Sequence, residues 1–334
     1  MHVLFRVDGG PDIGYGHLIR SNALAEELIN TDHRVSVATT NPSPARSVFP
    51  GSIDILELLS REDPEPFITL FDSVTPDVVF MDAYPVNTEY QRTIRDRVSC
   101  AVLQDDARHA ICADLFVNGN LYADALEYQF AAEKPRVCLG TDYALLRREI
   151  RERIPDDPLC RESPKHAIVT MGGSDIAGLT PTVIRAFDSF DLLVDVIVGP
   201  GFSTQQERAI RKTAKDCSTN ISISRDPDDL VERMVWADFA VSTASSTTYE
   251  LLALGTPIVS IPVVDNQEPI AKALKDRDAA TVLPRGANKT QFRNAIQQYL
   301  RDPELRQTRQ RRGMELVDGK GAERVCNEVL SIAA

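Results

Sequence analysis

The chain has 334 residues, of which 43% are hydrophobic and 26% charged, and it carries a formal net charge of −12. This composition excludes a disordered or fibrous protein, and the length predicts two domains. The excess of acidic residues argues against nucleic acid or an anionic membrane as a partner.

The sequence has no run of 18 apolar residues and no leader pattern, which predicts a cytoplasmic protein without a membrane span. Its six cysteines show no C-x-x-C spacing. They are expected to be reduced thiols, and neither a disulfide framework nor a zinc site is predicted.

Strand and helix patterns alternate along the first half of the chain. Runs rich in β-branched residues predict strands at 3–7, 34–38, 53–58, 78–82, 100–103, 115–118 and 136–139. Amphipathic runs predict helices at 18–29, 64–74 and 87–98. Such alternation is typical of a parallel sheet with helices on both faces.

A charged segment with several prolines, 154–165, follows and predicts a linker. The second half repeats the strand pattern at 166–171, 193–198, 221–224, 239–242, 258–261 and 281–283. Helices are predicted from Leu179 and at 290–300, 303–316 and 322–332, the last of which could pack back across the linker.

The predicted fold class is therefore α/β, with two Rossmann-like doubly wound domains facing across a cleft. The N-terminal domain is assigned to 1–153 and the C-terminal domain, with its final helices, to 166–334. In such sheets ligands bind beyond the carboxyl ends of the strands, so the loops at those ends are the candidate sites.

The stretch Asp12–Arg20 joins the first predicted strand to the first predicted helix. Gly14 and Gly16 allow a tight turn whose backbone N–H groups, with the positive end of the helix dipole, would bind an anion. His17 would then point its imidazole into the same cleft, and we expect it to carry the chemistry. The alternative is a histidine that caps the helix or lies on the surface. Tyr84 follows a neighbouring strand and should bring its hydroxyl near His17.

Two loops of the second half have the composition of phosphate and ribose sites. Gly173 and Ser174 follow a strand and could bind phosphate through their N–H groups and the Ser174 hydroxyl. The alternative is a simple strand-to-helix turn. Ser246 and Thr247 could bind a diphosphate and Glu250 a ribose diol, with an ordinary capping box as the alternative.

Asn266 and Gln267 begin the next helix, and their side chains suit sugar hydroxyls or phosphate oxygens. Asp105-Asp106 is not read as a metal site, because no third ligand stands at a suitable spacing. Trp236 is expected in the core, and four histidines are expected to be structural or surface residues: His2, His33, His109 and His166.

Six motifs occur in order along nearly the whole chain: Ile13-Gly14-Tyr15-Gly16-His17-Leu18-Ile19-Arg20, Leu139-Gly140-Thr141-Asp142-Tyr143-Ala144-Leu145-Leu146-Arg147, Gly172-Gly173-Ser174-Asp175, Tyr249-Glu250 with Leu254-Gly255-Thr256-Pro257, Asp265-Asn266-Gln267 and Val317-Asp318-Gly319-Lys320-Gly321-Ala322. Together they resemble the UDP-sugar hydrolases of the pseudaminic acid pathway and their spore-coat polysaccharide relatives.

The resemblance implies a glycosyltransferase-B-like fold that cleaves a UDP-activated 2,4-diacetamido-2,4,6-trideoxy sugar with water, without a metal or cofactor. It implies that His17 is the catalytic residue, that Tyr84 and Asn266 lie in the cleft and that Glu250 binds the ribose. Arg20, three residues after His17 in the first motif, is also counted as substrate-binding.

The sequence departs from the family pattern at Ala244-Ser245 and at Gly9-Gly10, both in ligand-facing loops, and these departures bear on which sugar is bound. Two other functions stay open. One is a glycosyltransferase of the same fold, and the other is a non-catalytic nucleotide-sugar binder that assists neighbouring pathway enzymes.

Overall fold

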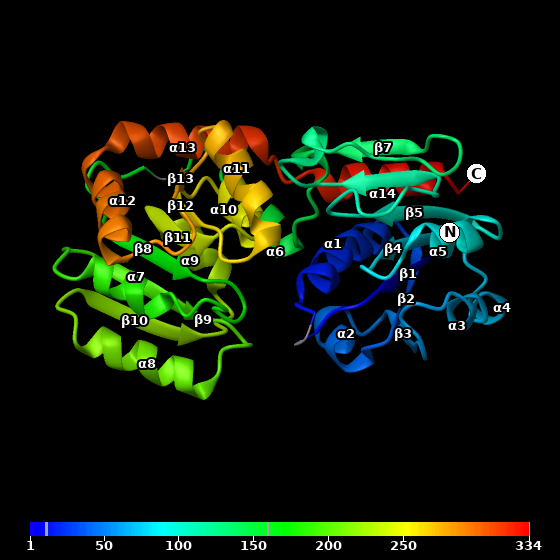
Figure 1. The fold of residues 1–334 in the computed structure, drawn as a ribbon, viewed down its shortest axis with the longest axis horizontal. Helices are drawn as coiled ribbons and strands as arrows, with labels where there is room; N and C mark the ends of the chain where they lie inside the picture. Colours follow the sequence, from blue (N-terminus) through cyan, green and yellow to red (C-terminus); the bar gives the residue numbers. More distant parts are fainter. Residues whose placement is uncertain (11–12, 159, 334) are drawn as a thin grey trace. The chain divides into compact units, whose positions relative to one another are not determined.

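The computed structural model describes residues 1–10, 13–158 and 160–333 (Figure 1). Asp12, which opens the predicted histidine loop, lies outside the described residues. The chain folds into two compact units. Unit 1 comprises Met1–Arg148 and Gly319–Ala334, and unit 2 comprises Glu149–Asp318.

Unit 1 is built on a parallel sheet of seven strands in the order β3-β2-β1-β4-β5-β6-β7. All seven strands were predicted from the sequence, to within a residue or two at their ends. They are β1 (His2–Val7), β2 (Arg34–Thr39), β3 (Asp54–Glu57), β4 (Val78–Asp82), β5 (Ser99–Leu103), β6 (Leu115–Asn118) and β7 (Arg136–Leu139).

Helices cover both faces of this sheet (Figure 1). They are α1 (Gly16–Asn30), α2 (Pro42–Val48), α3 (Glu65–Ile68), α4 (Phe71–Val74), α5 (Thr88–Arg95) and α14 (Gly321–Ser331), with the short 3₁₀ turns η1 (Ala123–Ala125) and η2 (Thr141–Tyr143). The short helix α6 (Arg148–Arg151) spans the boundary between the two units.

The single helix predicted at 64–74 is wrong, because the structure divides it into α3 and α4. The Thr69 hydroxyl donates to the carbonyl of Pro66, which a continuous helix would offer to the N–H of Leu70. That N–H instead bonds the carbonyl of Phe67, one residue closer. The helix is therefore interrupted at this threonine.

The core of unit 1 has two layers, one on each face of the sheet. Alternate β1 residues face opposite layers, as a strand requires: Phe5 packs in one and Leu4 in the other. The first layer contains Leu24 of α1 and also Val325 and Val329 of α14. The last helix of the chain thus completes the core of unit 1, where it packs against α1.

Unit 2 contains a parallel sheet of six strands in the order β10-β9-β8-β11-β12-β13. The strands are β8 (His166–Thr170), β9 (Leu193–Val198), β10 (Asn220–Arg225), β11 (Phe239–Thr243), β12 (Ile258–Ile261) and β13 (Thr281–Val282). The helices are α7 (Thr180–Phe187), α8 (Thr204–Lys215), α9 (Leu230–Trp236), α10 (Thr247–Ala253), α11 (Glu268–Asp276), α12 (Lys289–Arg301) and α13 (Pro303–Leu316), with the 3₁₀ turn η3 (Asp265–Gln267).

The prediction that Trp236 belongs to the core is wrong, since its side chain is 61% exposed. Trp236 is the last residue of α9, and the guanidinium of Arg161 lies 5.9 Å from its ring centroid. The inward face of this helix is made by Val231 and Met234, which are buried. Within the described ranges, no helix is both long and apolar enough to cross a bilayer.

Candidate active site

Two backbone hydrogen bonds join Gly10 and Gly14 ahead of α1. The N–H of Gly10 donates to the carbonyl of Gly14 at 3.1 Å, and the N–H of Gly14 donates back at 2.7 Å. Gly14 has φ +93°, a conformation that side-chain-bearing residues rarely adopt. A Cβ on Gly9 would come within 2.5 Å of the Leu18 side chain, so this chain needs a glycine there.

His17 lies in the first turn of α1, and its side chain neither caps the helix nor lies on the surface. Only 7% of its surface is exposed. Its Nδ1 lies 2.6 Å from Oδ1 of Asp82, the last residue of β4. Because β1 and β4 are neighbouring parallel strands, the loop after β1 and the end of β4 meet at the same sheet edge.

Asp82 is fully buried and accepts hydrogen bonds at both carboxylate oxygens. Arg20 donates from Nε to Oδ2 at 2.7 Å and from a terminal nitrogen to Oδ1 at 2.6 Å, a two-point guanidinium–carboxylate pair. The hydroxyl of Ser21 adds a third donor at 3.2 Å. Burial alone would raise the pKa of Asp82, but the charge of Arg20 and its hydrogen bonds, with those of His17, hold that pKa far below its usual range.

This geometry fixes which imidazole nitrogen carries the proton. An ionised carboxylate only accepts hydrogen bonds, so a contact of 2.6 Å requires a proton on Nδ1 of His17. A terminal nitrogen of Arg20 also lies 2.9 Å from Nδ1, but its hydrogens can be directed to Asp82. With the neutral imidazole protonated on Nδ1, the lone pair is on Nε2, for which the described residues provide no hydrogen-bond donor.

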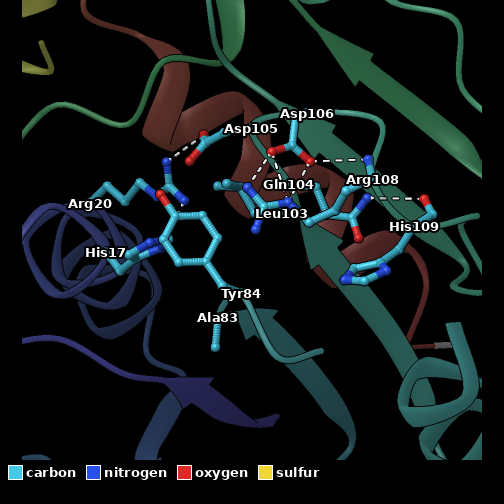
Figure 2. Close-up of a pocket in the computed structure, with 10 residues that line it drawn as sticks. All are labelled: His17, Arg20, Ala83, Tyr84, Leu103, Gln104, Asp105, Asp106, Arg108 and His109. Carbon is cyan, nitrogen blue, oxygen red and sulfur yellow. Dashed lines mark hydrogen bonds and ion pairs between the residues drawn. The ribbon is translucent and has the colours of Figure 1, made fainter. Parts of the chain in front are cut away.

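A pocket opens beside this network and is lined by residues after β4, by the end of β5 and the segment that follows it, and by two residues of α1 (Figure 2). The Tyr84 ring meets the His17 ring edge to face, with centroids 4.6 Å apart and planes at 87°. The guanidinium of Arg108 lies over the Tyr84 ring at 4.7 Å. The full lining is His17, Arg20, Ala83, Tyr84, Leu103, Gln104, Asp105, Asp106, Arg108 and His109.

Asp105 and Asp106 have different partners in this pocket. Oδ1 of Asp105 accepts from Arg20 at 2.7 Å, whereas Asp106 pairs with Arg108 (Figure 2). The same Oδ1 of Asp105 also accepts from Asn120 at 2.9 Å. Across the described residues, no group of three or more His, Cys, Asp or Glu side chains is arranged to hold a metal ion.

The structure thus brings together three of the predicted site residues, His17, Arg20 and Tyr84, with Gly14 ahead of α1 and Gly16 at its start. Sequence reasoning did not include Asp82, and it considered Asp105 only as a metal ligand. The available signal was a carboxylate at or just beyond the end of a buried strand, because Asp82 is the last residue of β4 and Asp105 lies two residues after β5.

The remaining predicted site residues lie in unit 2, along one edge of its sheet. Gly173 and Ser174 follow β8, Ser246, Thr247 and Glu250 follow β11, and Asn266 and Gln267 follow β12. Since β8, β11 and β12 are adjacent and parallel, these loops share the carboxyl edge.

Several of these residues also have local structural roles. The carbonyl of Gly173 accepts from the N–H of Gly201 at 2.9 Å, and Oε1 of Gln267 accepts from the N–H of Val263 at 2.9 Å. By contrast, the capping-box alternative for α10 is wrong, because Ser246 occupies the N-cap without a side-chain cap bond. Asn266 and Ser246 are exposed.

No family model matches the chain, but curated relatives do. It is 26% identical over 278 residues, 81% of this chain and 95% of the relative, to the UDP-2,4-diacetamido-2,4,6-trideoxy-beta-L-altropyranose hydrolase of Campylobacter jejuni. It is 24% identical to the spore coat polysaccharide biosynthesis protein SpsG of Bacillus subtilis, over 97% of this chain and 96% of the relative. An uncharacterized protein of Methanocaldococcus jannaschii is 23% identical over 78% of this chain, but the match spans only 55% of that longer protein.

Solved structures reproduce the fold over nearly the whole chain. MurG of Acinetobacter baumannii superposes with a TM-score of 0.71 at 16% identity, and the calicheamicin glycosyltransferase CalG4 with 0.68 at 14%, each covering 99% of this chain and 97% or more of the neighbour. The predicted glycosyltransferase-B-like class, with two Rossmann-like units, is confirmed. The family resemblance that the six motifs indicate is confirmed as well: over most of its length, the chain is similar to the UDP-diacetamido-trideoxy-altropyranose hydrolase and to SpsG.

Proposed function

We propose that this protein is a nucleotide-sugar hydrolase that cleaves a UDP-activated 2,4-diacetamido-2,4,6-trideoxy sugar into free sugar and UDP. Its product would serve the synthesis of pseudaminic acid, a nonulosonic acid, or of a surface polysaccharide. The named relatives support the substrate class, since one is a hydrolase of such a sugar and the other acts in polysaccharide biosynthesis.

The observation that carries the proposal is the His17–Asp82 pair. Asp82 accepts a hydrogen bond from the Nδ1–H of His17, so the basic lone pair of the imidazole is on Nε2. A histidine held in this way is suited to remove a proton from water. A residue that only bound a sugar would not need a buried carboxylate to fix its tautomer.

The reaction would be a direct displacement at the anomeric carbon. As water attacks, its oxygen forms a bond to that carbon and one water proton moves to Nε2 of His17. The bond from the anomeric carbon to the phosphate oxygen breaks, and its electron pair leaves with UDP. Attack on the face opposite the leaving group inverts the anomeric centre.

The charges near His17 favour a neutral sugar over a diphosphate in that pocket. Two guanidinium groups, Arg20 and Arg108, accompany three carboxylates, Asp82, Asp105 and Asp106. The net charge of these groups is slightly negative, which disfavours an anion in this pocket. We therefore assign the glycosyl part to this pocket.

The UDP part is assigned to the loops at the carboxyl edge of the unit 2 sheet. Glu250 would bind the ribose, while Gly173, Ser174, Ser246 and Thr247 would bind the diphosphate. Asn266 and Gln267 would contact the substrate at the same edge. Ser246, at the start of α10, is exposed and its side chain makes no capping hydrogen bond, which supports this assignment.

The proposal is tested by a proton NMR time course with UDP-2,4-diacetamido-2,4,6-trideoxy-β-L-altrose in water, without acceptor or added metal. We expect UDP and inverted free sugar from the wild type. The His17→Gln variant should lose about 10²- to 10⁴-fold in rate, the usual size of general-base catalysis. UDP binding by calorimetry should be unchanged in this variant.

His33→Gln is the matched control, because His33 lies beyond the opposite end of α1, and it should react at the wild-type rate. If His17→Gln kept most of the activity, His17 would not be the base.

The second candidate is a glycosyltransferase that uses a sugar or lipid hydroxyl in place of water. The fold of MurG and CalG4 favours it, although fold alone does not determine the acceptor. If the nucleotide sugar stayed intact in water and was consumed only when hydroxyl acceptors were added, the transferase would be supported. Binding of UDP-sugars without turnover under any condition would support a non-catalytic binder.

A further inference from the structure

We propose that Arg20 is a positioning residue that neutralises Asp82 and thereby leaves the His17 imidazole free to take up a proton during the reaction. This inference rests on the proposed function, in which His17 is the base. It gives Arg20 a role within the protein in place of the substrate contact expected from sequence.

The physical basis is that a fully buried carboxylate needs one compensating positive charge. Leaving Asp82 ionised without a cation would be costly, because charges lose most of their solvation inside a protein. Two neighbours could supply that charge: Arg20, which is always protonated, or His17 as an imidazolium. An imidazolium has no lone pair and cannot act as a base.

The hydrogen bonds indicate that Arg20 supplies the positive charge that compensates Asp82. Three of its five N–H groups are donated to carboxylates, two to Asp82 and one to Asp105. Asp105 is in turn held by Asn120, which anchors the outer side of the guanidinium. Arg20 therefore has few donors left for a ligand, while His17 can pair with Asp82 as a neutral donor.

The other groups around His17 do not replace this cation. From the segment after β4, Tyr84 contacts the imidazole with its ring edge, and its hydroxyl is neutral because burial raises its pKa. From the segment after β5, Asp105 binds Arg20, and Arg108 pairs with Asp106. His109 lines the same pocket and Ser21 bonds Asp82.

The inference predicts what happens when the guanidinium is removed. In Arg20→Met, Asp82 has only His17 as a cationic partner, so His17 should become an imidazolium at neutral pH. The acid limb of the pH–rate profile should then move about 1 to 3 pH units upward, the range that one neighbouring charge produces. Activity lost at pH 7 should return at higher pH with little change in KM.

The charge itself is tested with two further variants. Arg20→Lys keeps a positive charge without the planar fork, so its acid limb should stay closer to that of the wild type. In the double variant Arg20→Met with Asp82→Asn, neither charge is present, and the acid limb should return toward its original position. A purely packing role for Arg20 predicts neither result.

The deciding experiment is a pH titration of protein with ¹⁵N-labelled histidine, followed by NMR without any substrate. His17→Gln identifies the His17 signals, and Arg92→Met on the exposed face of α5 serves as the matched control. We expect neutral His17 protonated on Nδ1 in the wild type and an imidazolium over a wider pH range in Arg20→Met.

Equal titration of His17 in the wild type and Arg20→Met would overturn the inference. Because no substrate is present, this outcome is separate from a failure of the proposed hydrolysis. The time course with UDP-sugar tests that reaction independently.

Discussion

At the scale of single residues, the site is organised by one buried carboxylate. Asp82 contacts His17, Arg20 and Ser21, and it is fully buried at the end of β4. Its effect on His17 comes from charge and orientation, which an asparagine of the same shape would not reproduce.

Asp82→Asn should therefore lower the hydrolysis rate by about 10²- to 10⁴-fold, because the amide no longer requires the proton on Nδ1. The NMR time course measures the rate, and circular dichroism checks that the variant is folded. Ser21→Ala, which removes only the 3.2 Å bond, is the control and should keep most of the activity. A fully active Asp82→Asn would show that the imidazole does not depend on this carboxylate.

The same carboxylate gives a pH-dependent contribution to stability. The fold lowers the pKa of Asp82, so its stabilisation is fully present above the ordinary carboxyl pKa of about 4 and is lost as the pH falls toward the lowered value. Urea unfolding at several pH values should show Asp82→Asn less stable than the wild type at pH 7. The difference should shrink below pH 4, and a constant difference would contradict this assignment.

At the scale of elements, two of the six sequence motifs contact each other in the structure. The segment 317–322 leads into α14, and the segment 139–147 contains η2, against which α14 packs. A Cβ on Gly321 would overlap the backbone of Ala144. Arg324 of α14 also donates to the carbonyl of Asp142 at 2.9 Å. These motifs join the last helix to the end of the unit 1 sheet.

Gly321→Ala should therefore destabilise the protein by about 1–3 kcal/mol, the usual cost of forcing extra volume into a packed site. Urea unfolding measures this loss. Gly51→Ala is the matched control, since a Cβ on Gly51 meets no atom within 4 Å. Equal stability of the two variants would mean that the backbone around Ala144 moves aside easily.

At the scale of the whole molecule, unit 1 is assembled from both ends of the chain. The segment Gly319–Ala334 belongs to the same compact unit as Met1–Arg148. Val325, Cys326 and Val329 of α14 are buried in the layer that also contains Leu18 and Leu24. Unit 1 therefore needs the C-terminal helix to cover its core.

A chain ending at residue 318 should lose the stability of unit 1 but keep unit 2 folded. Hydrogen exchange measured by mass spectrometry should show faster exchange in β1–β7 and unchanged protection in β8–β13. The full-length chain is the reference. Retained protection in β1–β7 would show that the remaining contacts suffice without α14.

The sequence alone predicted the strands closely, because the alternation and β-branching of a strand report its own burial. The helices to which it gave bounds also lie close to those found, except where Thr69 interrupts one of them, but it gave no bounds for α2 or α8. The ordered motifs were enough to indicate the family resemblance, and His17 stood out because it follows a glycine turn at a helix start.

Only the tertiary structure decided which residues meet. His17 and Asp82 are 65 positions apart and come together because β4 pairs with β1, a choice that no local pattern encodes. Packing between distant segments likewise determines that Trp236 is exposed and that α14 belongs to unit 1. Periodicity reports local conformation and burial, whereas contacts between distant side chains follow from strand order.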